Sequence, residues 1–192
     1  GGSMIVAPDR SYVLHGFARR PIVGEFVECG VFAGGTAHLL AATLAAEGSV
    51  APLHLFDTFA GMPDTAQPER DFHGPGDFGD TSLGLVQRRL AAYTNVRYHP
   101  GFVPDTFAEL DADVRLAFVH VDLDIYPSVL AACDLWPRVV SGGVMIFDDY
   151  GFWHLRHAAR RAVDEYFAGQ ADKPIVLATG QAIVIRSSWP VS

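Results

Sequence analysis

Two groups of aspartates directly follow apolar runs of the chain. One run ends in HVDLD and supplies Asp122 and Asp124, and the other ends in IFDD and supplies Asp148 and Asp149. If the two runs are neighbouring parallel strands, Asp122, Asp148 and Asp149 meet at one edge of a sheet. Their charges then repel one another unless they are protonated or bridged by a cation. An all-oxygen site favours Mg²⁺, Mn²⁺ or Ca²⁺ over Zn²⁺. The alternative interpretation is that these aspartates cap the loops that follow them.

A second candidate site is the glycine-rich segment ECGVFAGGT, which runs from Glu28 to Thr36 and leads from an apolar run into a helical pattern. Gly30 permits a tight turn and a close approach of a ligand to the backbone, and Gly34 and Gly35 open the helix. The spacing differs from the dinucleotide fingerprint GxGxxG, and the Glu28 carboxylate would repel a pyrophosphate. It would attract a cationic group, such as the α-amino group or the sulfonium of S-adenosylmethionine. The alternative is a glycine-rich turn of another nucleotide-binding fold.

Two further strand ends extend this candidate cofactor site. Asp57 ends the second apolar run, where an acid can accept hydrogen bonds from both ribose hydroxyls. A cap of the following turn is the alternative for this residue. Gly101 and Phe102 follow the third run, where Phe102 would either pack against an adenine ring or belong to the core.

Alternating strands and helices must position these residues. Apolar runs predict strands at residues 25–30, 53–58, 96–101, 116–123, 144–149, 175–179 and 182–187. Helical patterns cover residues 36–46, 81–93, 127–136 and 154–168, the second with Asp80 as its N-cap. The first five strands show little alternation, which is typical of parallel strands buried on both faces, and Gly180-Gln181 permits a hairpin. We therefore predict an α/β, Rossmann-like fold with a seven-stranded, mostly parallel sheet, one antiparallel strand and helices on both faces.

One connection is unusually long. About 20 residues rich in Gly, Pro and Asp separate Thr58 from Asp80, whereas such loops typically have about 2–6 residues. Because the segment follows the second strand at the ligand edge, it predicts a lid. A tolerated surface insertion is the alternative.

Composition narrows the class of protein. The 192 residues carry 14 basic and 22 acidic side chains, a net charge of −8, which disfavours binding to nucleic acid or to an anionic membrane. No apolar run is long enough for a transmembrane helix. Cys29 and Cys133 lie in apolar segments, so we expect no disulfide framework and a reducing, cytoplasmic location. We expect one domain over residues 4–192, preceded by a cloning remnant at residues 1–3.

Four separated motifs resemble the macrocin O-methyltransferase (TylF-type) family. They are GEFVECGV at residues 24–31, DTFAGM at 57–62, GDFGDTS at 76–82 and GGVMIFDDY at 142–150. The resemblance implies a class I methyltransferase fold and an S-adenosylmethionine-dependent, Mg²⁺-dependent O-methyltransferase. Its acceptor would be a hydroxyl of a small molecule, a sugar of a natural product.

The resemblance also implies a role for individual residues. Glu28, Gly30, Gly34 and Gly35, followed by Thr36, would hold the methionine part of the cofactor. Asp57, with Thr58 and Phe59 beside it, would bind the ribose, and Asp80, Thr81 and Ser82 would close over the cofactor. Asp122, Asp148 and Asp149 match the magnesium ligands of the family, and Asp122 or Asp124 would be the general base.

The sequence departs from the family at its start. Members usually carry a longer, partly helical N-terminal region that covers the active site, whereas only about 20 residues precede the first predicted strand here. We therefore expect an open acceptor site, or one that is completed by another chain in a homodimer.

Other classes of protein fit these residues less well. A metal-dependent phosphohydrolase would need a lysine between its acidic motifs, and none lies between Asp122 and Asp148. A non-catalytic scaffold that retains the cofactor fold would not need intact acids at every expected position. A dehydrogenase is disfavoured by the spacing of the glycines.

Overall fold

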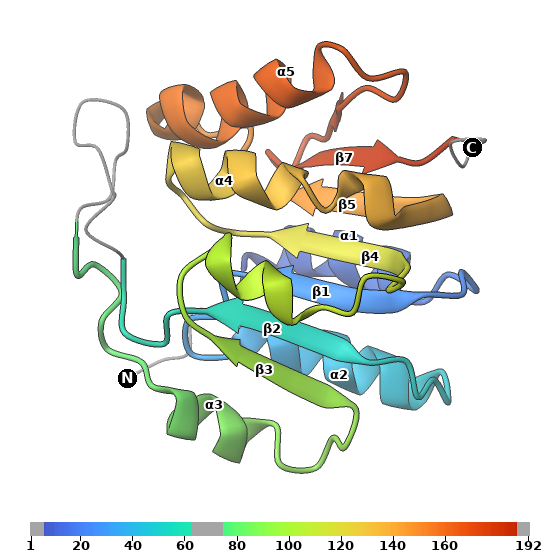
Figure 1. The fold of residues 1–192 in the computed structure, drawn as a ribbon, viewed down its shortest axis with the longest axis vertical. Helices are drawn as coiled ribbons and strands as arrows, with labels where there is room; N and C mark the ends of the chain where they lie inside the picture. The colour runs from blue at the N-terminus through green and yellow to red at the C-terminus, as the bar shows by residue number, and fades with distance from the viewer. Residues whose placement is uncertain (1–5, 63–74, 188–192) are drawn as a thin grey trace.

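A single seven-stranded sheet forms the centre of the molecule (Figure 1). The computed structural model describes residues 6–62 and 75–187. The strand order is β3-β2-β1-β4-β5-β7-β6. The strands are β1 (Glu25–Cys29), β2 (Leu53–Asp57), β3 (Val96–Pro100), β4 (Leu116–Val121), β5 (Val139–Phe147), β6 (Ile175–Val176) and β7 (Ala182–Ile185). Strands β1 to β5 pair in parallel, and β7 runs antiparallel between β5 and β6. This topology confirms the predicted sheet and places β4 beside β5.

Helices cover both faces of the sheet, as predicted (Figure 1). One face packs against α1 (Pro8–Ala18), α2 (Gly35–Ala46) and α3 (Leu83–Arg89), and the other against α4 (Tyr126–Cys133) and α5 (Arg161–Phe167). Short 3₁₀ turns lie at Asp105–Glu109, Trp136–Arg138 and Trp153–Leu155. Because strand side chains alternate between the faces, Phe26, Phe118 and Ile146 share the core beneath α1 and α2.

Helix α1 was not predicted, and its buried stripe explains why. Arg10, Leu14 and Ala18 are four residues apart and face inward, so one of the three buried positions carries a charged side chain. An arginine in the stripe removes the apolar periodicity by which a helix is recognised in a sequence.

Several predicted boundaries were wrong. Helix α3 begins after Ser82, whose hydroxyl accepts a hydrogen bond from the Leu85 N–H at 3.3 Å, so Ser82 and not the exposed Asp80 is the N-cap. The helix predicted at 154–168 divides into the 3₁₀ turn at Trp153–Leu155, a π-helical segment at Arg156–Arg160 and α5.

The strands near the C-terminal end of the sheet also differ from the prediction. Strand β5 starts at Val139, five residues earlier than expected. The sequence did not reveal this part of the strand because Gly142 (φ 77°) and Gly143 lie within it, at a shift in its register with β4. Strand β6 ends at Val176, where the chain turns and the Leu177 N–H donates to the Gln181 carbonyl at 2.8 Å.

Two sequence-based expectations concern the surface of the molecule. The predicted lid between Thr58 and Asp80 falls largely on residues 63–74, which lie outside the described residues. Among the helices of the described part of the chain, none is both long and apolar enough to cross a membrane.

Candidate active site

A cavity of about 510 Å³ lies at the carboxyl ends of β1, β2, β4 and β5. This is the edge at which open α/β sheets bind their ligands. Of the predicted site residues, the cavity is lined by Gly30, Thr36, Asp57, Thr58, Thr81, Gly101, Phe102, Asp122, Asp124, Asp148 and Asp149. The tertiary structure therefore brings the glycine-rich segment and both aspartate groups to one space.

The remaining predicted residues do not line this cavity; they are Glu28, Gly34, Gly35, Phe59, Asp80 and Ser82. Glu28 is fully buried in β1. Gly34 is the N-cap of α2 in a left-handed conformation with φ 77°, and Gly35 is the first residue of that helix. Asp80 and Ser82 are exposed, and Ser82 caps α3. Their roles toward a cofactor stay predictions.

Gly30 is required by a close contact within the protein. Its φ is +89°, and a Cβ added there would lie 1.8 Å from the carbonyl oxygen of Asp122. The two segments are also joined by the Asp122 N–H, which donates to the Cys29 carbonyl at 2.8 Å. The close approach that we expected between Gly30 and a ligand is therefore made by the backbone that carries the first aspartate group.

Asp57 holds the glycine-rich segment in place. One carboxylate oxygen accepts hydrogen bonds from the N–H groups of Val31 at 2.6 Å and Phe32 at 3.0 Å, and the other accepts from Phe59 at 2.6 Å. The alternative interpretation of Asp57 from the sequence, a cap of the turn that follows it, is therefore correct. Asp57 also lines the cavity, so the ribose contact stays a prediction beside it.

Thr81 connects the end of the long segment to the glycine-rich segment. Its hydroxyl donates to the Phe32 carbonyl. Phe78 lies edge-on to the Phe32 ring, with ring centroids 5.7 Å apart. The described end of the long segment is therefore fastened beside the cavity.

The four aspartates gather at the ends of β4 and β5. Single ligand atoms of Asp122, Asp124 and Asp149 lie within 4.8 Å of one another, and the same holds for His120, Asp122 and Asp148. Asp124 has a left-handed backbone, with φ 59°, where the chain turns toward α4. All four line the cavity, as predicted for Asp122, Asp148 and Asp149, but these three do not form one group of neighbouring ligand atoms: Asp149 lies with Asp122 and Asp124, and Asp148 lies with Asp122 and His120.

Three of these aspartates lie in surroundings that disfavour their charged form. Burial raises the pKa of Asp122, Asp124 and Asp149, and the neighbouring carboxylates raise the pKa values of Asp122 and Asp124 further. One oxygen of Asp149 is buried and has no hydrogen-bond partner among the described residues. The group is therefore unfavourable as three bare carboxylates.

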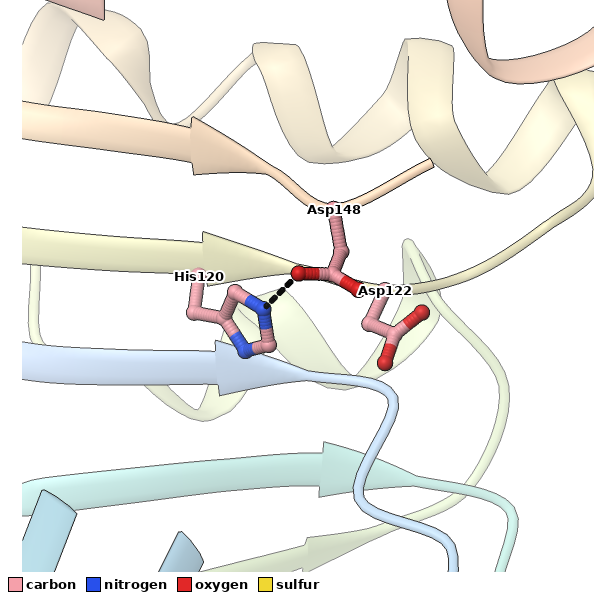
Figure 2. A group of neighbouring side chains, drawn as sticks. All are labelled: His120, Asp122 and Asp148. Atoms are coloured by element: carbon pink, nitrogen blue, oxygen red, sulfur yellow. Dashed lines mark ion pairs between the residues drawn. The ribbon is translucent and has the colours of Figure 1, made fainter. Parts of the chain in front are cut away.

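Asp148 differs from its neighbours because its charge is balanced. Burial alone would raise its pKa, but the interaction with the nearby His120 imidazole and the charge of Arg10 outweigh burial and lower it. The guanidinium of Arg10 donates to Oδ2, and the amide of Gln181 donates to Oδ1 at 2.8 Å. Figure 2 shows the His120 imidazole directed at Asp148, with Nε2 at 3.5 Å from Oδ1.

His120 also contacts a second carboxylate. Its Nδ1 lies 3.2 Å from Oε1 of Glu28, and both side chains are fully buried. Burial would lower the pKa of His120, but the ion pair with Asp148 and the hydrogen bond with Glu28 outweigh it and raise the pKa to about 9. The imidazole is therefore a buried cation at neutral pH.

Arg10 and His120 are the charged site residues that the sequence analysis missed. Arg10 lies in the unpredicted helix α1 and lines the cavity, where its guanidinium also packs 4.3 Å from the centre of the Phe152 ring. No local pattern marks it. For His120 a signal existed in the sequence. It lies two residues after Phe118 and therefore on the same face of a buried strand, where a polar side chain needs a charged or hydrogen-bonding partner.

The chemistry of the acidic group fits a divalent cation. Asp122, Asp124 and Asp149 offer only carboxylate oxygens, which suits Mg²⁺, Mn²⁺ or Ca²⁺, whereas the group with Asp148 also contains the His120 imidazole. One oxygen of Asp149 has no hydrogen-bond partner among the described residues, and a nearby cation would favour the ionised forms of Asp122 and Asp124, which burial and neighbouring carboxylates disfavour. The arrangement can hold a cation and accept a proton close to it.

Comparisons with known proteins agree with this architecture. Residues 12–183 match the family described as macrocin O-methyltransferase (TylF). The chain is 32% identical over 157 residues to 8-demethyl-8-(2,3-dimethoxy-α-L-rhamnosyl)-tetracenomycin-C 4′-O-methyltransferase of Streptomyces olivaceus, covering 76% of this chain and 58% of that protein. The structure of the O-methyltransferase NovP has a TM-score of 0.82 at 25% identity and covers 97% of this chain and 83% of NovP. The O-methyltransferase TomG from Streptomyces achromogenes, in complex with SAM, shares the fold, with a TM-score of 0.65 at 17% identity over 96% of this chain and 82% of TomG.

The relatives and the family model cover different parts of their own length. The chain spans only 58–62% of the length of the curated relatives that it matches. The family match, in contrast, includes every strand of the sheet except the last residues of β7, together with all of the aspartates at the cavity. The chain belongs to the macrocin O-methyltransferase (TylF) family.

Proposed function

We propose that this protein transfers a methyl group from S-adenosylmethionine to a hydroxyl of a sugar on a natural product, with a divalent cation, Mg²⁺, at the acceptor. The observation that carries the proposal is the single cavity in which the glycine-rich segment meets the carboxylate group. The family supports methyl transfer to oxygen, and a relative named for a rhamnosyl tetracenomycin supports a sugar acceptor.

The cofactor would bind along the ends of β1, β2 and β3. Gly30 and Thr36 would border its methionine part, Asp57 and Thr58 its ribose, and Phe102 its adenine ring. All five line the cavity in the order in which their strands lie in the sheet. Asp57 already accepts three backbone hydrogen bonds, so it would fix the loop and the ribose together.

The cation would be held by Asp122, Asp148 and Asp149. When bound, it would orient the acceptor oxygen and lower the pKa of its hydroxyl. Arg10 and Gln181 fix Asp148 in place, whereas one oxygen of Asp149 has no hydrogen-bond partner among the described residues and would be available to the ligand. A bound cation would favour the ionised forms of Asp122, Asp124 and Asp149, which burial disfavours.

Asp124 would act as the general base. The acceptor hydroxyl would give its proton to the Asp124 carboxylate, and its oxygen would take the methyl group. S-adenosylmethionine, when bound, would supply that methyl group from its sulfonium and be left as S-adenosylhomocysteine. Burial and the nearby Asp149 raise the pKa of Asp124, which makes it a stronger base than an exposed aspartate.

The proposal is tested by calorimetric titration of S-adenosylhomocysteine into the protein, in Mg²⁺ and in EDTA. Micromolar binding is expected, followed by Mg²⁺-dependent methylation when glycosylated natural products are offered with S-adenosylmethionine. Absence of binding in both buffers would contradict the methyltransferase proposal and would direct assays toward phosphate ester hydrolysis. Equal turnover in Mg²⁺ and in EDTA would refute the role of the cation.

A further inference from the structure

Three ionisable side chains form a row across the floor of the site, one from each of three adjacent strands or strand ends. Glu28 in β1 lies directly opposite His120 in β4, and His120 lies opposite Ile146 in β5, two residues before Asp148. Because side chains alternate along a strand, all three lie on the face covered by α1 and α2. His120 stands between the two carboxylates, with its ring directed at Asp148 in Figure 2.

The row is isolated from water, and its two carboxyl groups meet only through the His120 ring between them. Glu28 and His120 are 0% exposed and Asp148 is 1% exposed. A carboxylate buried without a partner is strongly unfavourable, so each carboxylate needs the imidazole. Asp148 has Arg10 and Gln181 as further partners, but Oε2 of Glu28 has no hydrogen-bond partner among the described residues. Glu28 thus depends on His120 more than Asp148 does.

The two ends of the row support different parts of the cavity. Glu28 lies two residues before Gly30, at the start of the glycine-rich segment. Asp148 belongs to the carboxylate group. Glu28 and His120 do not line the cavity, so we expect them to act through the residues that do. Any effect of His120 on binding must pass through the segments that its two partners carry.

We infer that His120 is a positioning residue that couples the glycine-rich segment to the carboxylate group, so that one imidazole links binding of the cofactor to binding of the cation. The inference rests on the proposed function. A cation that draws on Asp148 weakens the pairing between Asp148 and His120, and the imidazole then pairs more strongly with Glu28. Glu28 and the following glycine-rich segment are held more firmly as a result, so the cation tightens binding of the cofactor.

The coupling is measured with S-adenosylhomocysteine, which lacks the sulfonium charge and so has little direct electrostatic interaction with a cation. Its affinity is determined by calorimetry in EDTA and in saturating Mg²⁺, and the Mg²⁺ affinity is determined with and without it. In the wild-type protein each ligand is expected to tighten the other about fivefold or more, by the same factor in both directions. In His120→Gln, both ligands still bind, and the factor falls to about one.

His54→Gln provides a matched control. His54 is also a buried strand histidine between two partners, with Nε2 at 2.6 Å from Glu25 and Nδ1 at 2.8 Å from His99, but it does not line the cavity. It should keep the wild-type coupling factor. Wild-type coupling retained in His120→Gln, or lost equally in His54→Gln, would overturn the inference.

Two further outcomes are distinguished in the wild-type protein. If S-adenosylhomocysteine binds under neither condition, the proposed function fails, and this inference fails with it. If His120→Gln does not fold, the ring nitrogens of His120 are observed by NMR during separate titrations of the wild-type protein with Mg²⁺ and S-adenosylhomocysteine. Both ligands are expected to shift these resonances. A response to one ligand alone would refute the coupling, because a merely structural imidazole has no reason to report both.

Discussion

Replacing Arg10 with methionine should remove the ion pair that joins α1 to the carboxylate group and so destabilise the fold. The guanidinium pairs with Oδ2 of Asp148, and the two side chains are 9% and 1% exposed. Its Nε also donates to the Thr179 carbonyl at 3.4 Å, and the group packs on the Phe152 ring. Methionine keeps a similar apolar stem, so the substitution removes the charge and the hydrogen bonds but little of the packing.

The size of the effect follows from what Asp148 retains. Removing one partner of a buried ion pair typically costs about 3–5 kcal/mol. Asp148 still has His120 and Gln181, so we expect the lower end, a loss of about 3 kcal/mol in the free energy of unfolding. The contact between Arg10 and Asp149, at 3.9 Å, is too long to add much. For a protein of this size the loss corresponds to a fall in Tm of about 6–12 °C.

The assay is urea-induced unfolding in EDTA, which keeps divalent cations from replacing the lost charge. Arg19→Met is the matched control, because Arg19 caps the same helix and pairs with Glu47 at 2.5 Å on the surface. Those side chains are 55% and 38% exposed, and such a pair contributes only about 0–1 kcal/mol. If Arg10→Met is no less stable than Arg19→Met, then α1 is not anchored through Asp148 and the reasoning is wrong.

Four further results are expected. The raised pKa of His120, about 9 against about 6.5 when unfolded, gives stability that is complete below pH 6.5 and lost as the pH rises through 9. The wild-type unfolding free energy in EDTA should therefore fall by up to about 3 kcal/mol over this range, and a flat profile would contradict the buried cation. Asp149→Ala should abolish Mg²⁺-dependent turnover and leave the S-adenosylhomocysteine affinity measured in EDTA nearly unchanged; full activity would remove Asp149 from the cation site. Asp124→Asn should lower kcat about 10²–10⁴-fold with both affinities within a few fold, and an unchanged kcat would exclude it as the base. Gly30→Ala should lower the free energy of unfolding by more than about 4 kcal/mol or prevent folding, because its Cβ would lie 1.8 Å from a backbone atom. Gly48→Ala is the control: Gly48 has φ +67° and nothing within 4 Å of an added Cβ, so the loss should be about 1–2 kcal/mol. Equal losses in urea unfolding would disprove the contact at Gly30.

The sequence by itself determined the sheet and the edge at which the site lies. Short continuous apolar runs that alternate with helical patterns are typical of parallel strands buried on both faces, and the residues that end such strands share an edge. The placement of Asp122, Asp148 and Asp149 at one edge was predictable for that reason. So was the meeting of the glycine-rich segment with the aspartates, because β1 and β4 are neighbours in the order that the crossovers favour.

Only the tertiary structure decided which charges are balanced. Arg10 reaches Asp148 across 138 positions of the chain, and nothing local in α1 indicates that contact. His120 joins Glu28 to Asp148 because the register of three strands aligns them, and register is set by packing over the whole sheet. Gly30 is required by the backbone of Asp122, which approaches it only after β1 and β4 have paired. Local patterns record which residues are apolar, whereas the partner of a buried charge depends on how distant elements dock.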